Sequence, residues 1–419
     1  MKMKKYLFFI ACLFSSTFMI AQTPNAGCDG KRYVQDLFPD TTMTEVKYGS
    51  SIGILKLKKD LDMSIVQPKG DVLAKRPLII FAFGGGFVTG QRQDMLRYCL
   101  PFTKKGYVTA TIDYRLFPFV PLGVPDSLQL SRVSTQAAQD MKAAIRYFYK
   151  DAQTTNTFKI DTNNIIVGGI SAGAITAILA AQLDATDPIA PWLKTIIDNE
   201  GGLEGASGNP GYSSKVHGLI NMSGSIYQKE WIDKGDVPFI SFHGTVDDTV
   251  AYAYGKNVFG LYGNGSAKMY PQALKVGVPS VFISAPGGAH TNIYKDSKFK
   301  SYLADFTARS FVFCKQIVCK EPIVSFSTTG VDDIDYRQVN IFPNPSSDDI
   351  TLSLGENSIG GYRVEVFDLT GRMIFNSGKQ NDTQFILKKE NIGQGMFVTR
   401  VVFEEKQAVL VRKIIFYRN

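Results

Sequence analysis

The sequence has few of the residues that bind metals. Only 3 of its 419 residues are histidines and 5 are cysteines, and it contains no C-x-x-C pair and no cluster of histidine with cysteine. A structural zinc site needs about four such ligands at close spacing. We therefore expect no metal site, and no motif in the chain points to another cofactor.

A nucleic-acid-binding signature is also missing, although the formal net charge is +8 and the sequence pI is near 9.0. The lysines and arginines are spread along the chain and gather only in short clusters. A protein that binds nucleic acid concentrates its basic residues on one face or in a known motif. The sequence therefore predicts no nucleic-acid partner.

The chain lacks an apolar run long enough for a comfortable membrane span. The apolar stretch at residues 6–20 follows three lysines, contains polar residues at 15–17, and leads to a small residue, Ala21. Charged, apolar and small-residue regions in this order are typical of a secretory signal, which we place at residues 1–21. A membrane anchor is the alternative interpretation.

Four cysteines remain after the predicted signal: Cys28, Cys99, Cys314 and Cys319. In an exported protein they permit two disulfides, and four cysteines allow three pairings. Cys314 and Cys319 are close enough in sequence to pair with each other. The sequence leaves the pairing open.

The most informative segment is the pentapeptide G-I-S-A-G at residues 169–173, with Ser171 at its centre. A strand-like apolar run at 165–167 precedes it, and a helix-like run rich in alanine follows at 174–181. A serine on such a turn has a strained backbone that exposes its hydroxyl, and a side chain at either flanking glycine would clash. Ser171 is the predicted nucleophile; a plain turn of small residues is the alternative.

A serine hydroxyl needs an imidazole to take its proton and a carboxylate to orient that imidazole. In the hydrolase chain order the acid lies between the serine and the histidine. His290, in a glycine-rich loop after the strand candidate 278–284, is therefore the predicted base. We expect His243 to hold its loop in shape and His217 to be a surface or structural residue.

Asp247 is the predicted acid. It lies after the strand candidate 237–242, in the pattern H-G-x-x-D-x-x-V. The neighbouring Asp248 is the alternative, because a pattern alone does not separate adjacent residues. For either aspartate, a carboxylate that caps the loop is the competing interpretation.

Three glycines at residues 84–86 follow the apolar run 77–83, which predicts a buried strand. Glycines let backbone N–H groups point at a developing negative charge. The amides of Gly85 and Gly86, with that of Ala172, are the predicted oxyanion hole. A phosphate-binding loop is the alternative, but neither Gly-Lys-Ser/Thr nor G-x-G-x-x-G occurs here.

Strand-like and helix-like segments alternate across residues 22–321, which predicts an α/β domain whose mostly parallel sheet has helices on both faces. A stretch at 184–215, rich in proline and glycine, interrupts this rhythm, and we interpret it as a lid-like insertion at the active site. Residues 322–338 have the composition of a linker. Short alternating strands at 339–419 predict a small all-β sandwich.

These residues together resemble the α/β-hydrolase superfamily, in particular its carboxylesterase and hormone-sensitive-lipase-like branches with a GGG-type oxyanion loop. The segments D-Y-R-L at 113–116 and K-I-D-T-N-N-I at 159–165 extend the similarity. Phe83 departs from the usual histidine before the glycines, and Ala174 from a usual glycine. The resemblance implies a secreted serine carboxylic-ester hydrolase with an acyl-serine intermediate.

Segments at 340–345, 364–372 and 393–398 resemble, in this order, the motifs of the C-terminal sorting domain of type IX secretion cargo. The resemblance implies export by the type IX secretion machinery and a secreted or cell-surface location, in agreement with the predicted signal. It also implies later removal of the domain. A carbohydrate-binding sandwich is the alternative, but we find no aromatic cluster in this region that supports it.

The resemblance and the predicted export imply that the substrate is an ester of a small molecule or an extracellular polymer, such as a polysaccharide (feruloyl or acetyl esters included), a lipid or a polyester. Phe87, Trp192 and Tyr227 are candidates for lining its pocket, although a place in the core fits them equally well. Two rival functions remain. A serine peptidase of the prolyl-oligopeptidase type usually carries an N-terminal propeller, for which residues 1–76 leave no room. A catalytically inactive hydrolase fold used for adhesion usually loses the serine or the histidine.

Overall fold

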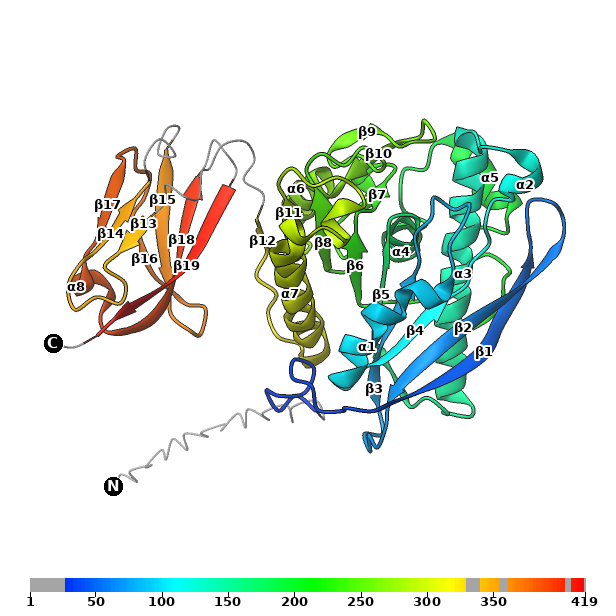
Figure 1. The fold of residues 1–419 in the computed structure, drawn as a ribbon, viewed down its shortest axis with the longest axis horizontal. Helices are drawn as coiled ribbons and strands as arrows, with labels where there is room; N and C mark the ends of the chain where they lie inside the picture. Colours follow the sequence, from blue (N-terminus) through cyan, green and yellow to red (C-terminus); the bar gives the residue numbers. More distant parts are fainter. Residues whose placement is uncertain (1–26, 329–339, 355–360, 404–407, 418–419) are drawn as a thin grey trace, which may run out of the picture.

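The computed structural model describes residues 27–328, 340–354, 361–403 and 408–417. The predicted signal and most of the predicted linker lie outside these residues. The chain forms an α/β domain and a smaller all-β domain that begins at residue 340 (Figure 1). The predicted fold class is confirmed for both.

A nine-stranded sheet runs through the α/β domain. In spatial order its strands are β1 (Thr41–Ile52), β2 (Lys58–Pro68), β4 (Val108–Ile112), β3 (Arg76–Ala82), β5 (Ile160–Ile170), β6 (Gly218–Met222), β8 (Phe239–Gly244), β11 (Ser280–Ala285) and β12 (Phe326–Ser327). The pairs from β1 to β4 are antiparallel and all later pairs are parallel. Every residue of β3, β4, β6, β8 and β11 is buried, so these strands appear in the sequence as continuous apolar runs.

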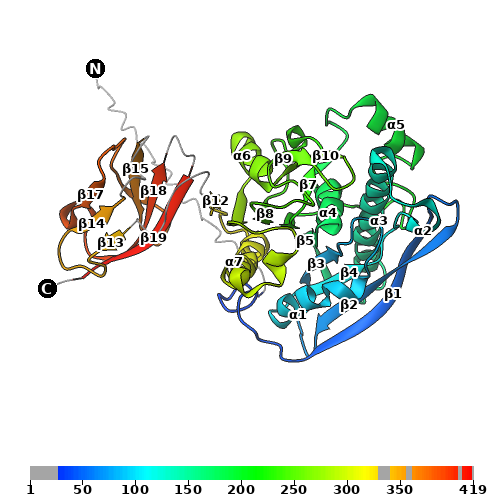
Figure 2. The ribbon, with the colours of Figure 1, turned by 45° about the horizontal axis from the view of Figure 1, so that its top comes forward.

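Helices cover both faces of this sheet (Figure 2). The long ones are α1 (Leu96–Lys104), α3 (Ser127–Gln153), α4 (Ala172–Gln182), α6 (Ser266–Val276) and α7 (Lys300–Cys319). On β6, Gly218 faces Ile317 of α7, whereas Asn221 points to the opposite face and donates a hydrogen bond to Ser266 of α6. In the part of the chain that the structure describes, no helix is both long and apolar enough to cross a membrane.

Short elements complete the α/β domain. They are the helices α2 (Phe119–Leu122) and α5 (Pro191–Asn199), the 3₁₀ turns Arg92–Met95, Lys229–Trp231, Asn292–Tyr294 and Ser297–Phe299, and the strands β7 (Ser225–Ile226), β9 (Tyr254–Lys256) and β10 (Tyr262–Gly265). The three strands form a separate antiparallel sheet. The turn between β9 and β10 supplies one wall of the candidate site described below.

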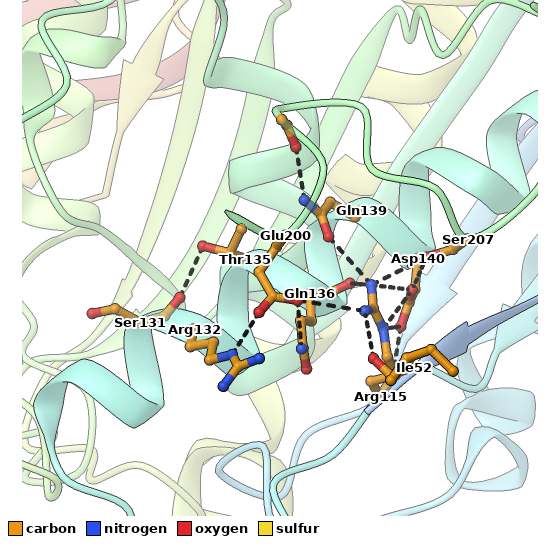
Figure 3. Close-up of polar contacts among 11 residues, drawn as sticks. Ile52, Arg115, Ser131, Arg132, Thr135, Gln136, Gln139, Asp140, Glu200 and Ser207 are labelled. Carbon is orange, nitrogen blue, oxygen red and sulfur yellow. Dashed lines mark hydrogen bonds and ion pairs between the residues drawn. The ribbon is translucent and has the colours of Figure 1, made fainter. Parts of the chain in front are cut away.

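The segment 184–215, for which we predicted a lid-like role, makes its closest described contacts away from Ser171. After α5, its glycine-rich loop packs against α3 and β1, where the Ser207 carbonyl accepts a hydrogen bond from the Ser50 amide at 2.8 Å. The Ser207 hydroxyl lies 2.5 Å from Asp140, which forms a buried ion pair with Arg115 at 2.8 Å (Figure 3). A buried ion pair needs further hydrogen bonds to offset the loss of its hydration. The Ser207 hydroxyl donates one of them to Asp140, and this contact attaches the loop to α3.

One disulfide, between Cys28 and Cys319, joins the first described segment to the end of α7. The alternative pairing of Cys314 with Cys319 is wrong, because residues five apart on a helix point in different directions. Cys314 faces the core, and Cys99 is buried elsewhere; both are free thiols. Burial raises the pKa of the Cys99 thiol to about 12, so it stays protonated and unreactive.

We predict that Cys28→Ser lowers the free energy of unfolding by about 2–5 kcal/mol, because the bridge closes a very long loop in the unfolded chain. Guanidinium unfolding without reductant measures the loss. Cys319→Ser should lose as much, and the double variant no more than either single one. A larger loss in the double variant would mean that the two cysteines act separately.

The C-terminal domain is a sandwich of two antiparallel sheets. One contains β13 (Asn340–Phe342), β14 (Ile350–Ser353) and β17 (Gln384–Leu387), and the other β16 (Met373–Asn376), β15 (Tyr362–Phe367), β18 (Gly395–Phe403) and β19 (Ala408–Phe416). A short helix, α8 (Lys389–Ile392), precedes β18. Inward residues such as Leu352, Val364 and Val401 form its own core, which follows from the alternating pattern of the strands.

Two aspartate turns near the end of α4 place four carboxylates close together. In one turn Asp187 accepts a hydrogen bond from the Asp184 amide, and in the other Asp236 accepts one from the Asp233 amide. Burial and the neighbouring negative charges raise the pKa of Asp187 to about 6 and that of Asp236 to about 7. Between the ordinary carboxyl pKa and these raised values, Asp187 and Asp236 are therefore protonated in the folded protein but ionised in the unfolded chain.

The stability contribution of these two carboxyls is fully present below pH 4 and is lost as the pH rises through 6 to 7. We expect Asp236→Asn to match the wild type in melting temperature at pH 4 and to exceed it at pH 8, as measured by calorimetry. Asp94→Asn, at an exposed position, should show no such pH-dependent gain. A variant that is less stable than the wild type at pH 8 would contradict this prediction.

Candidate active site

Ser171 lies between β5 and α4 with φ +56° and ψ −122°, a conformation that L-residues rarely adopt. A Cβ atom at Gly169 would lie 2.3 Å from the Gly173 backbone, and one at Gly173 would lie 2.1 Å from the Ala82 carbonyl at the end of β3. The Ser171 amide donates to the Met222 carbonyl at 2.8 Å. The close packing of strand and helix thus holds the strained residue in place.

The structure brings Ser171, His290 and Asp247 together. The Ser171 Oγ lies 2.8 Å from His290 Nε2, and His290 Nδ1 lies 2.7 Å from Asp247 Oδ2. Asp247 follows β8 and His290 follows β11, and these neighbouring parallel strands end at the same edge of the sheet as β5. Because the Asp247 carboxylate only accepts, Nδ1 carries the proton and Nε2 is left to accept one from Ser171.

The Asp247 carboxylate is fully buried and has four donors around it. Its Oδ1 accepts the amides of Thr249 and Val250 at 3.0 and 2.9 Å, and its Oδ2 faces His290 and His243. Burial alone would raise the pKa of Asp247, but the hydrogen bonds from the two imidazoles outweigh it and hold the pKa well below its ordinary value. The carboxylate is therefore ionised at neutral pH.

The alternative acid, Asp248, lies elsewhere. Its side chain is exposed and accepts a hydrogen bond from the Thr249 hydroxyl at 3.2 Å. His217, at the opposite end of β6, accepts the Ile165 amide at 3.3 Å, and burial lowers its pKa to about 4. Neither residue contributes to the group around Ser171.

Gly85 and Gly86 form a tight turn directly after β3, with φ +115° and +63°. A Cβ atom at Gly85 would lie 2.1 Å from the Thr89 carbonyl, so only glycine fits there. Ala172 is the first residue of α4, where helix geometry leaves the N–H group free. None of these three amides donates a hydrogen bond to another described residue, and all three residues line the cavity beside Ser171.

This cavity has a volume of about 450 Å³ and reaches Ser171 and His290. Its walls are mainly apolar: Phe87, Val88, Leu130, Ile175, Val258 and Phe259. The sequence pointed to Phe87 only. Leu130 lies on α3, and Val258 and Phe259 lie in the turn between β9 and β10, where no motif marks them.

Trp192 and Tyr227, the other two candidates for the substrate pocket, do not line this cavity. They border a separate hollow of about 370 Å³ together with Leu261 and Tyr262. Trp192 is 47% exposed on α5, and the Tyr227 hydroxyl is bound to Ser134 of α3. The residues 184–215 likewise contribute nothing to the cavity at Ser171.

Within the described ranges, no group of three or more histidine, cysteine, aspartate or glutamate side chains has the arrangement of a metal site.

Comparison with known families divides the chain in the same way as the structure does. Residues 63–224 match the family model described as BD-FAE, and residues 340–417 match the secretion system C-terminal sorting domain. The first match spans β2 to β6 and includes Ser171; the second spans β13 to β19.

Two curated proteins are similar to parts of the chain. An α/β hydrolase of Acanthamoeba polyphaga mimivirus is 31% identical over 126 residues, which is 30% of this chain and 32% of that protein. An ulvan lyase of Nonlabens ulvanivorans is 25% identical over 89 residues, which is 21% of this chain and 16% of that protein. The chain thus spans about a third of the first relative and less than a fifth of the second.

Solved structures of an esterase from Thermogutta terrifontis are also similar. The form with propionate bound is 20% identical with a TM-score of 0.47, and the match covers 65% of this chain and 94% of that one. The form with butyrate bound is 19% identical with a TM-score of 0.47, covering 68% and 97%.

Proposed function

We propose that this chain, which carries an α/β-hydrolase domain and a type IX secretion sorting domain, is a secreted serine carboxylic-ester hydrolase. The observation that carries the proposal is the hydrogen-bonded series from Ser171 through His290 to Asp247, at one end of an apolar cavity. The sorting domain indicates a secreted or cell-surface location. The charged and apolar start of the chain fits the secretory signal that such a route requires.

In the first half of the reaction, Ser171 Oγ attacks the ester carbonyl carbon while His290 Nε2 takes the hydroxyl proton. The carbonyl oxygen becomes negative, and the free amides of Gly85, Gly86 and Ala172 donate hydrogen bonds to it. The tetrahedral intermediate then breaks its bond to the alkoxy oxygen, and His290 returns the proton to the departing alcohol. An acyl group remains on Ser171.

Water repeats the sequence in the second half. His290 Nε2 takes a proton from the water, whose oxygen attacks the acyl carbon, and the same amides stabilise the negative oxygen. Collapse of this intermediate releases the carboxylic acid and returns the proton to Ser171 Oγ. Asp247 stays ionised throughout and orients the imidazole with Nε2 toward the reacting atoms.

Ser171→Ala should abolish hydrolysis of a 4-nitrophenyl ester and labelling by a fluorophosphonate probe, because no nucleophile remains. Asp247→Asn should lower kcat/KM by about a thousandfold or more, since an amide in this place favours the wrong imidazole tautomer. The matched variant Asp248→Asn should keep wild-type activity. Retained activity in Ser171→Ala would refute the mechanism, and an unlabelled wild type would favour an inactive adhesion protein.

Two cations border the mainly apolar cavity. Arg97, from α1, and Lys295, which follows the turn at His290, both line it, and neither forms an ion pair with a described carboxylate. No aspartate or glutamate lines the cavity. We infer that the enzyme prefers esters that carry an anionic group a short distance from the scissile bond.

This preference is measured as the ratio of kcat/KM for 4-acetoxybenzoate to that for the neutral 4-acetoxybenzamide. Arg97→Gln and Lys295→Gln should each lower the ratio about two- to fivefold, the worth of an exposed ion pair. High salt should lower the wild-type ratio in the same direction. Lys275→Gln, an exposed lysine on α6, is the control; an equal loss there would mean that only the net charge matters.

A further inference from the structure

A second imidazole faces the acid of the candidate triad. His243 Nε2 lies 3.2 Å from Asp247 Oδ2 and 3.1 Å from the Val250 carbonyl oxygen. The side chains of His243 and Asp247 are both fully buried. Because a carboxylate and a carbonyl only accept hydrogen bonds, Nε2 of His243 must carry a proton. This N–H group donates to the Val250 carbonyl and also faces the Asp247 carboxylate.

The other ring nitrogen of His243, Nδ1, is held by a hydrogen bond on the side away from Asp247. It lies 3.0 Å from Ser266 Oγ. The Asn221 amide oxygen accepts the Gly224 amide at 2.8 Å, so the Asn221 NH₂ group faces Ser266 at 3.2 Å and Ser241 at 3.1 Å.

These contacts suggest which group donates each hydrogen bond between Asn221, Ser266 and His243. Ser266 Oγ accepts from Asn221, and its own hydroxyl proton is left for His243 Nδ1. This assignment, made from the partners of each group, places a proton on Nε2 of His243. The hydrogen bonds run from Asn221 through Ser266 to His243, whose Nε2 faces Asp247 at 3.2 Å.

Uncharged residues pack around the His243 ring. Ser284 of β11 pairs with it in the sheet, and the Tyr252 ring packs edge-on against it with centroids 5.7 Å apart. Among the contacts of the described residues, Asp247 is the one charged group that touches the His243 ring.

We propose that His243 is a positioning residue for the ester hydrolase: its N–H group fixes the Asp247 carboxylate and shares its negative charge with His290. The proposal rests on the function proposed above. Both imidazole N–H groups face the same oxygen, Oδ2, with His290 Nδ1 at 2.7 Å and His243 Nε2 at 3.2 Å, while the Thr249 and Val250 amides donate to Oδ1. Asp247 therefore orients His290 but raises the basicity of its imidazole less than an unshared carboxylate would. The imidazole can then both take the proton of Ser171 and give it up again.

Two serines offer a matched test. Ser241 and Ser266 are both buried, and each accepts one hydrogen bond from Asn221, but only Ser266 reaches His243. Ser266→Ala should lower kcat about three- to tenfold with KM unchanged, because the His243 ring loses the group that fixes it. Ser241→Ala should stay within about twofold of the wild type, although both variants lose similar stability. Equal kcat values in the two variants would overturn the proposal.

Substitution of His243 itself tests the shared charge. In His243→Leu the whole Asp247 charge acts on His290, so the acid limb of the kcat/KM profile should move to higher pH and kcat should fall about tenfold. His243→Gln keeps a donor and should restore most of both quantities. A purely structural role would change the amount of folded enzyme and leave the acid limb in place. If His243→Leu does not fold, the serine pair still decides.

A measurement that needs no turnover separates this proposal from the proposed function. The chain has 3 histidines, so the imidazole N–H protons are readily assigned by NMR. The His290 Nδ1–H signal should shift in Ser266→Ala and stay in place in Ser241→Ala, and no difference between them would refute the role of His243. A wild type that neither hydrolyses esters nor binds the fluorophosphonate refutes the enzyme instead.

Discussion

The backbone at Ser171 keeps its left-handed conformation because the chain crosses closely on both sides of it. Gly169 lies against the first turn of α4 and Gly173 against the end of β3, at distances that leave no room for a Cβ atom. Strain of this kind costs of order 1–3 kcal/mol and persists only where the surrounding structure over-determines it. The buried strands β3 and β5 supply that surrounding, so the position of the hydroxyl depends on the core beneath it.

The parallel arrangement explains why residues far apart in sequence meet at this point. Ser171, Asp247 and His290 each follow a strand, and 119 residues separate the serine from the histidine. The same arrangement places His243 one position before the end of β8, within reach of Asp247 and of α6. An imidazole at a strand end is therefore held by the sheet on one side and by a helix on the other.

The sequence predicted most of what depends on local chemistry. The turn at Ser171, the glycine turn at Gly85 and the alternation of strands and helices follow from steric and hydrophobic patterns over a few residues. The packing of the segment 184–215 depends on a long-range contact, because the Arg115–Asp140 pair binds Ser207 from another part of the chain. The cavity walls were missed for the same reason: Val258 and Phe259 are ordinary apolar residues until the turn between β9 and β10 folds over Ser171. Trp192 and Tyr227 are aromatic residues of the kind that line substrate pockets, but they border a different hollow from the cavity at Ser171.

The Cys28–Cys319 bridge makes the α/β domain a covalent ring. Its two cysteines flank almost the whole sheet, so neither end of the domain can peel away alone. The ring can close only when α7 is present, because Cys319 is the last residue of that helix. Cutting the chain after Cys319, on the side of the sorting domain, would leave this ring intact.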